Sequence, residues 1–188
     1  MANMNPEISN SDYQLAVQLL GRDPRTPFAI KTRCGDGSPQ VLIADPVFFE
    51  DGIWKPFPAF LWLVCPRLKI LVAELEQQGY IRKYSQQLES DEDFRQRFLS
   101  SQTQISAIRV EMAEKLYPGE LPEHIREVLT ETTIAGSRDF RGVKCLHSHL
   151  AHELAFAGNP IGADVINIVG HCSKVDNCSH LNKGGNLE

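Results

Sequence analysis

The segment from residue 142 to residue 152, GVKCLHSHLAH, contains one cysteine and three of the six histidines in the chain. Thiolates and imidazoles bind zinc and similar metals, and they also serve as nucleophiles, acids and bases near neutral pH. Titratable side chains that are concentrated in this way are enriched at functional sites. The segment is therefore the first place in which we expect chemistry.

A helical reading of this segment divides its side chains between two faces. At about 100° per residue, the apolar stripe consists of Val143, Leu146, Leu150 and Leu154. Cys145, His149 and His152 share the opposite face at offsets that suit metal ligands on one helix. His147 borders the stripe and points inward. If the helix begins after Cys145, however, the cysteine can turn toward His147, and both groupings stay open.

Three cysteines have a basic residue within two positions in the sequence: Cys34 with Arg33, Cys65 with Arg67, and Cys145 with Lys144. A neighbouring positive charge favours the thiolate. Cys65 also precedes Pro66, a typical first residue of a helix, so its sulfur would lie at the positive end of the helix dipole. A packing role stays open for Cys65, because buried cysteines commonly act as small hydrophobic residues.

Composition and charge exclude several classes of protein. The chain has 188 residues with 19 Lys and Arg against 24 Asp and Glu, which argues against binding to nucleic acids or membranes by bulk charge. The longest apolar run covers residues 59–65, far short of the ~20 residues that span a bilayer, and the N-terminus lacks the pattern of a signal peptide. We expect a cytoplasmic protein, in which five cysteines fit thiols or metal ligands better than disulfides.

Apolar periodicity predicts an α+β fold in which a small, mostly antiparallel sheet packs with several helices in one domain, residues 1–170. Strands are expected at 27–33 and 40–44, with Val47 and Phe48 added to the second, and at 57–65 as a central buried strand. Helices are expected at 12–20, from 66 to a stop at Gly79, at 90–116, at 122–132, and on both sides of Gly158-Asn159-Pro160.

Residues 171–188 are polar and lack apolar periodicity, so we expect a flexible tail. The tail offers four potential zinc ligands, His171, Cys172, Cys178 and His180, but their spacing is not that of a common zinc motif. The chain also lacks a phosphate-binding glycine loop, a GxSxG elbow, an HExxH helix and a Rossmann glycine pattern.

Four sequence features together carry a resemblance to a known family. They are Arg33-Cys34, FPxxxWLxCPR at 57–67, VKCLHxxxAH at 143–152 and NPIG at 159–162. With them the chain resembles a bacterial family of unknown function, domain of unknown function family 501, from about residue 13 to 169. The resemblance implies that Cys34, Cys65, Cys145, His147 and His152 are the polar positions of the family, with Arg67 and Lys144 beside them. His149 and the cysteines of the tail are not part of that pattern, and the family implies no activity.

We favour a composite metal site made of Cys34, Cys65, Cys145 and one of His147 or His152. Zinc accepts such ligands, in a structural site when four come from the protein and in a catalytic site when water takes one position. An iron–sulfur cluster held by the three cysteines is the alternative cofactor.

Two other hypotheses remain, and the sequence does not decide whether the protein is an enzyme. A metal-free enzyme would use Cys65 or Cys145 as nucleophile and His147 or His152 as base, and would bind a small anionic molecule through Arg33, Arg67 and Lys144. A regulatory or adaptor domain would instead bind a partner through the exposed face of the helix at 94–116.

Overall fold

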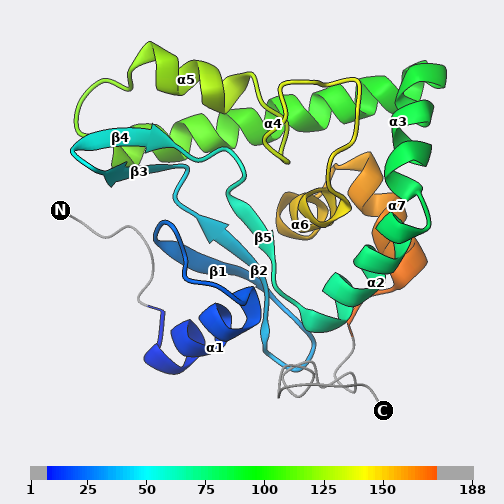
Figure 1. Cartoon of the computed structure of the whole chain (residues 1–188), viewed down its shortest axis with the longest axis horizontal. Coiled ribbons are helices and arrows are strands. Elements are labelled where there is room, and N and C mark those ends of the chain that lie inside the picture. Colours follow the sequence, from blue (N-terminus) through cyan, green and yellow to red (C-terminus); the bar gives the residue numbers. More distant parts are fainter. Residues whose placement is uncertain (1–7, 173–188) are drawn as a thin grey trace.

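The computed structural model describes residues 8–172, which form seven helices and five strands (Figure 1). This confirms the predicted α+β fold, in which a small antiparallel sheet packs with several helices. Among the described residues, no helix is both long and apolar enough to cross a membrane.

The main sheet consists of three antiparallel strands in the order β1 (Phe28–Arg33), β2 (Pro39–Ala44) and β5 (Leu61–Leu63). The expected hairpin of β1 and β2 is confirmed. β5 lies at an edge of the sheet, so the prediction of a central strand is wrong, but its residues are buried because helix α6 (Leu146–Phe156) packs against it. β1 and β5 both run antiparallel to β2 and therefore both end beside its start.

A second hairpin consists of β3 (Val47–Glu50) and β4 (Ile53–Pro56). Val47 and Phe48 therefore do not extend β2, because Pro46 lacks the N–H group that a continued strand would need. Asp51 and Gly52 connect β3 to β4 with φ values of 55° and 81°, as a type I′ turn requires.

Four helices lie close to the predicted positions: α1 (Asn10–Leu20), α2 (Pro66–Gln77), α4 (Glu92–Leu116) and α5 (Glu123–Thr130). Pro66 begins α2 with Cys65 as its N-cap residue, as predicted. Helix α3 (Tyr80–Ser90) was not predicted, because it buries only Tyr84 and Leu88 and so lacks a continuous apolar stripe.

Helix α6 lies between the main sheet and the helices α2 and α7 (Pro160–Val169), and it is the element that positions the candidate site (Figure 1). The side chain of Asn159 caps α7 by accepting a hydrogen bond from Gly162 N at 2.9 Å, as predicted. Gly162 allows the two helices to approach closely, since a Cβ atom there would lie 2.6 Å from Glu153 Cβ and would also overlap the carbonyl oxygen of His149.

Candidate functional site

The five predicted metal ligands occupy three separate places in the structure. Cys34 and Cys65 lie with Cys172, and Cys145 and His147 lie with Glu76. His152 lies with His149 and Asn159 in the interior. The predicted composite site is thus divided into three groups, because side chains on the two faces of α6 pack against different elements.

The three cysteines Cys34, Cys65 and Cys172 have sulfur atoms that all lie within 4.8 Å of one another. Cys34 directly follows β1, and Cys65 follows β5 as the N-cap residue of α2. The backbone N–H of Cys65 also bonds to Gln40 O on β2 at 3.3 Å. The register of the sheet therefore brings the first two cysteines together, since β1 and β5 end beside the start of β2.

Cys172 reaches this group from the end of α7, and Arg67 holds the chain there. The Arg67 guanidinium donates hydrogen bonds to Val169 O at 3.0 Å and to Gly170 O at 3.1 Å. These carbonyls end α7, where a positive charge complements the helix dipole. The sulfur of Cys172 lies 3.1 Å from that of Cys65.

Burial and mutual hydrogen bonding govern the protonation of these thiols. Hydrogen bonding to Cys172 is the main cause that raises the pKa of Cys65 to about 12. Cys172 and Cys65, together with burial, raise the pKa of Cys34 far above its ordinary value. These directions are opposite to the one expected from Arg33 and Arg67, and both favour the protonated thiol near neutral pH.

The second group consists of Glu76 on α2 and Cys145 and His147 at the start of α6, again with ligand atoms within 4.8 Å of one another. Helix α6 begins at Leu146, so Cys145 turns toward His147, and its sulfur lies 3.9 Å from His147 Nδ1. Glu76 Oε1 accepts a hydrogen bond from Leu146 N at 2.7 Å and lies 3.2 Å from His147 Nδ1. The second grouping considered in the sequence analysis is therefore the one that forms.

Both ring nitrogens of His147 face oxygen atoms. Nδ1 faces Glu76, and Nε2 lies 3.2 Å from the backbone oxygen of Lys69. Burial by itself would lower the pKa of His147, but Cys145 and Glu76 outweigh it and raise the pKa to about 9. For Cys145, burial by itself would raise the pKa. Hydrogen bonds with His147 and the Ser148 backbone outweigh burial, so the pKa of Cys145 lies below its ordinary value.

His149 and His152 form the third group, which lies in the interior. The side-chain nitrogen of Asn159 donates to Nδ1 of His149 at 3.1 Å and to Nδ1 of His152 at 2.9 Å. Burial is the main cause that lowers the pKa of His149 to about 3 and that of His152 to about 4. The face that the helical reading assigns to ligands is therefore covered by α7, and both histidines are neutral hydrogen-bond acceptors.

The predicted anion-binding residues Arg33 and Arg67 each have partners within the protein. Arg33 pairs with Asp12 at 2.7 Å, and Arg67 binds the end of α7 as described above. Lys144 is exposed and precedes Cys145.

Sequence analysis missed the roles of Glu76 and Asn159 in these groups, because no motif marks a helical glutamate as the partner of a histidine 71 residues away. The sequence groups Cys172 with His171, Cys178 and His180 as potential zinc ligands of the tail, whereas the structure places it with Cys34 and Cys65. Cys178 and His180 lie outside the described residues.

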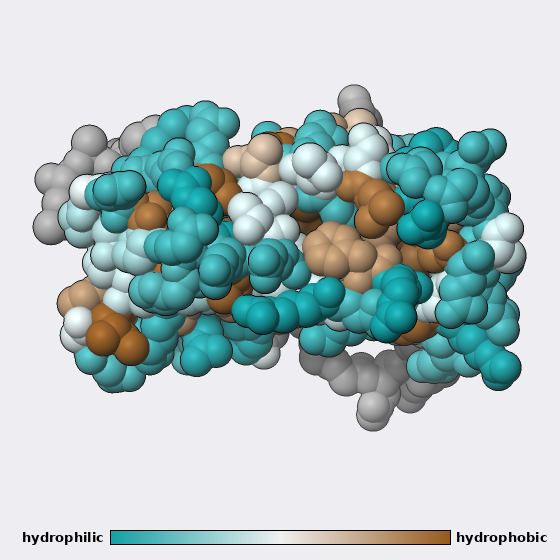
Figure 2. All heavy atoms as spheres, turned by 90° about the horizontal axis from the view of Figure 1, so that it is seen from above, coloured by the Kyte–Doolittle hydropathy of each residue, from teal (hydrophilic) through white to brown (hydrophobic). Residues whose placement is uncertain are grey.

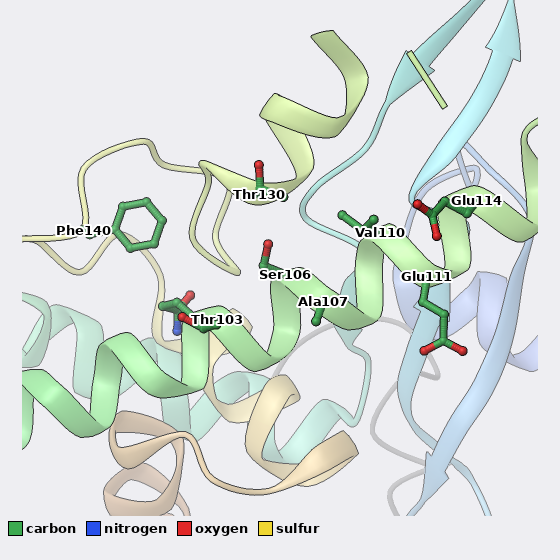
Figure 3. A pocket seen from close by; sticks show the side chains of 9 residues that line it. Thr103, Ser106, Ala107, Val110, Glu111, Glu114, Thr130 and Phe140 are labelled. Carbon is green, nitrogen blue, oxygen red and sulfur yellow. The ribbon is translucent and has the colours of Figure 1, made fainter. Parts of the chain in front are cut away.

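A surface pocket of about 550 Å³ lies apart from these groups, between α4 and the segment after α5 (Figure 3). Its lining contains no cysteine or histidine, and its acidic residues Glu111 and Glu114 pair with Lys115 and Arg126. The face seen from above in Figure 2 is largely hydrophilic, with hydrophobic residues in small groups. Neither feature adds a chemical group to the candidate site.

Comparison with known proteins gives one match. A family model described as "Protein of unknown function (DUF501)" matches residues 30–167. The matched part contains both residues 34 and 65 and all members of the second and third groups, whereas Cys172 follows it. No curated protein and no solved structure matches the chain.

Proposed function

Since the chain belongs to the DUF501 family, whose description states no activity, we propose a function from its own residues: it binds one metal ion, zinc, through Cys34, Cys65 and Cys172. The observation that carries this proposal is the convergence of three sulfur atoms from three distant segments within 4.8 Å. Cys34 is 6% exposed and Cys65 is 0% exposed, so the sulfurs of these two residues are shielded from water.

The separations of the sulfurs suit a single ion. A tetrahedral zinc with Zn–S bonds of ~2.3 Å places its thiolates about 3.8 Å apart. The three sulfurs lie within 4.8 Å of one another, and the 3.1 Å between Cys65 and Cys172 would have to lengthen around an ion. An iron–sulfur cluster would bind three cysteines through at least two iron atoms and would hold sulfurs on different irons farther apart. The geometry therefore favours zinc over a cluster.

The ion would join three parts of the fold. Cys34 belongs to the turn between β1 and β2, Cys65 to the junction of β5 and α2, and Cys172 to the segment after α7. Linking such segments is the ordinary role of a structural zinc site. Three thiolates leave one coordination position for a fourth ligand, and the sequence offers Cys178 and His180 after Cys172.

Elemental analysis of zinc-reconstituted protein tests this proposal. We expect about one zinc per chain in the wild type, a loss of that zinc in Cys34→Ser, Cys65→Ser and Cys172→Ser, and full retention in the matched control Cys145→Ser. Cobalt substitution should give thiolate-to-metal absorption that the same three variants lack. Wild-type protein without stoichiometric metal, or equal metal content in all variants, would contradict the proposal. A brown, iron-containing protein after anaerobic purification would contradict zinc and indicate an iron–sulfur cluster instead.

A further inference from the structure

We infer that Cys145 is a reactive thiolate, paired with His147 and Glu76, that attacks small anionic disulfides and forms a mixed disulfide with them. This inference does not depend on the zinc site. It concerns a different cysteine, a different helix end and a different reaction.

The acceptors around His147 determine its protonation state. Glu76 Oε1 and Lys69 O both face its ring nitrogens at 3.2 Å, and a carboxylate and a carbonyl can only accept hydrogen bonds. A neutral imidazole carries one N–H and satisfies one of them, whereas the imidazolium donates to both. The surroundings therefore select a positively charged His147, and its Nδ1 lies 3.9 Å from the Cys145 sulfur. A cation at this position stabilises the thiolate over the thiol.

Cys145 is the N-cap residue of α6. Backbone N–H groups at a helix N-terminus point toward this position and stabilise negative charge. The Ser148 backbone is among the groups that lower the pKa of Cys145. Glu76 accepts the N–H of Leu146, so the helix holds its carboxylate, and hydrogen bonding to His147 outweighs the effect of the Glu76 charge on the Cys145 thiolate.

Among the described residues, the groups that face the pair each have a defined place. From α2, Glu76 contacts His147, whereas Lys69 contributes its backbone oxygen, since its Nζ donates to Leu19 O at 3.1 Å. α3 faces the segment through the hydroxyl of Ser85, which accepts from Val143 N. Lys144 is exposed beside the cysteine and supplies a positive charge to an incoming anion.

Access separates Cys145 from Cys34 and Cys65, whereas Cys172 is half-buried as Cys145 is. Cys145 is half-buried, whereas Cys34 and Cys65 are buried. Within the described residues, the group around Cys145 contains Glu76 and His147 and no second cysteine. A disulfide formed at Cys145 therefore joins it to the small molecule.

The reaction balances without another reagent. The Cys145 thiolate attacks one sulfur of the small disulfide, the reagent's S–S bond breaks, and a new S–S bond forms to Cys145. The electron pair leaves on the second sulfur as a thiolate, which the His147 imidazolium can protonate. A thiol reductant reverses the step.

The test is the reaction of the full-length protein, prepared with and without added zinc, with the anionic chromogenic disulfide dithiobis(nitrobenzoate), followed by mapping of the modified cysteine by mass spectrometry. We expect one rapid phase of about one equivalent at Cys145, still rapid below the pH of ~8.5 at which an ordinary cysteine ionises. Cys145→Ser should lose this phase. His147→Gln keeps Cys145, but its reaction with the disulfide should be about tenfold or more slower at pH 6. The midpoint of the rate against pH should also move upward. The exposed His124→Gln is the matched control and should react as the wild type does.

Three results would overturn the inference: mapping of the rapid phase to another cysteine, uniformly slow labelling of the folded protein, or equal rates in the wild type and His147→Gln. Circular dichroism of each variant shows that it is folded. Zinc content is measured on the same samples. A protein that lacks zinc but reacts rapidly at Cys145 contradicts only the metal proposal, and a protein that binds zinc but does not react rapidly at Cys145 contradicts only this inference.

Discussion

The guanidinium of Arg67 donates a hydrogen bond to the carbonyl of Gly170 over 3.1 Å and so joins the first turn of α2 to the end of α7. Cys65 precedes Arg67 by two positions, and Cys172 follows Gly170 by two. One side chain thus sets the approach of two of the proposed zinc ligands. The role differs from the anion binding that the sequence predicts for Arg67.

Replacement of Arg67 by alanine should weaken zinc binding about tenfold, because residues that orient metal ligands contribute at this level. Loss of its hydrogen bonds to Val169 O and Gly170 O should also lower the free energy of unfolding by about 2 kcal/mol. Chelator competition measures the first effect and urea denaturation the second. Arg82→Ala, at an exposed position on α3, is the matched control. Unchanged zinc affinity in Arg67→Ala would show that Arg67 does not orient the proposed zinc ligands.

Replacement of Gly162 by alanine should lower the free energy of unfolding by about 2–3 kcal/mol. The added Cβ would lie 2.6 Å from Glu153 Cβ and overlap the carbonyl of His149, so α6 and α7 would have to separate. Gly142→Ala is the control, since its nearest neighbours would lie 4.0 Å away. Denaturation curves of the two variants should differ accordingly, and equal midpoints would show that the two helices can shift freely.

The stability of the protein should fall with acid because of His149 and His152. Their folded-state pKa values are lowered to about 3 and about 4, so the unfolded chain, with an ordinary histidine pKa near 6.5, binds more protons below that pH. Their contribution is therefore fully present above pH ~6.5 and is lost as the pH falls toward these values, at about 1.4 kcal/mol per pH unit for each histidine. Urea denaturation between pH 7 and 4 measures the slope.

His152→Gln should show a shallower slope than the wild type over this interval, and its stability at neutral pH should be lower because a buried hydrogen bond is disturbed. His124→Gln, at an exposed position on α5, should keep the wild-type slope. The same slope in all three proteins would mean that His152 does not gain a proton on unfolding.

Arg109 on α4 should not tolerate lysine, although the charge is kept. Its guanidinium donates to Pro58 O at 2.9 Å, Thr133 O at 3.3 Å and Thr132 O at 2.5 Å, and the residue is 0% exposed. Lysine cannot form this fork, and buried carbonyls would lose their donor. Arg109→Lys should cost about 2–3 kcal/mol in thermal or urea denaturation, whereas the exposed Arg138→Lys should be neutral. A neutral Arg109→Lys would show that water replaces the lost donors.

Several local features could be predicted from the sequence because their causes act over a few residues. Pro66 begins α2 and makes Cys65 its N-cap residue, and Asn159-Pro160 begins α7 in the same way. The turn after Cys34 closes the β1–β2 hairpin. The position of β5 at a sheet edge and the pairing of β3 with β4 were not predicted, since apolar runs do not state which strands pair.

The sequence by itself determined that cysteines and histidines are the candidates for chemistry, that Cys34 and Cys65 follow strands, and that the start of α6 would decide the partner of Cys145. Only the tertiary structure decided the grouping. Cys172 joins Cys34 and Cys65 because the sheet register and Arg67 bring three segments together, and Glu76 meets His147 because α2 packs against α6. His149 turns inward because Gly162 lets α7 cover its face. Such contacts depend on packing between distant segments, which the spacing of residues along one helix cannot express.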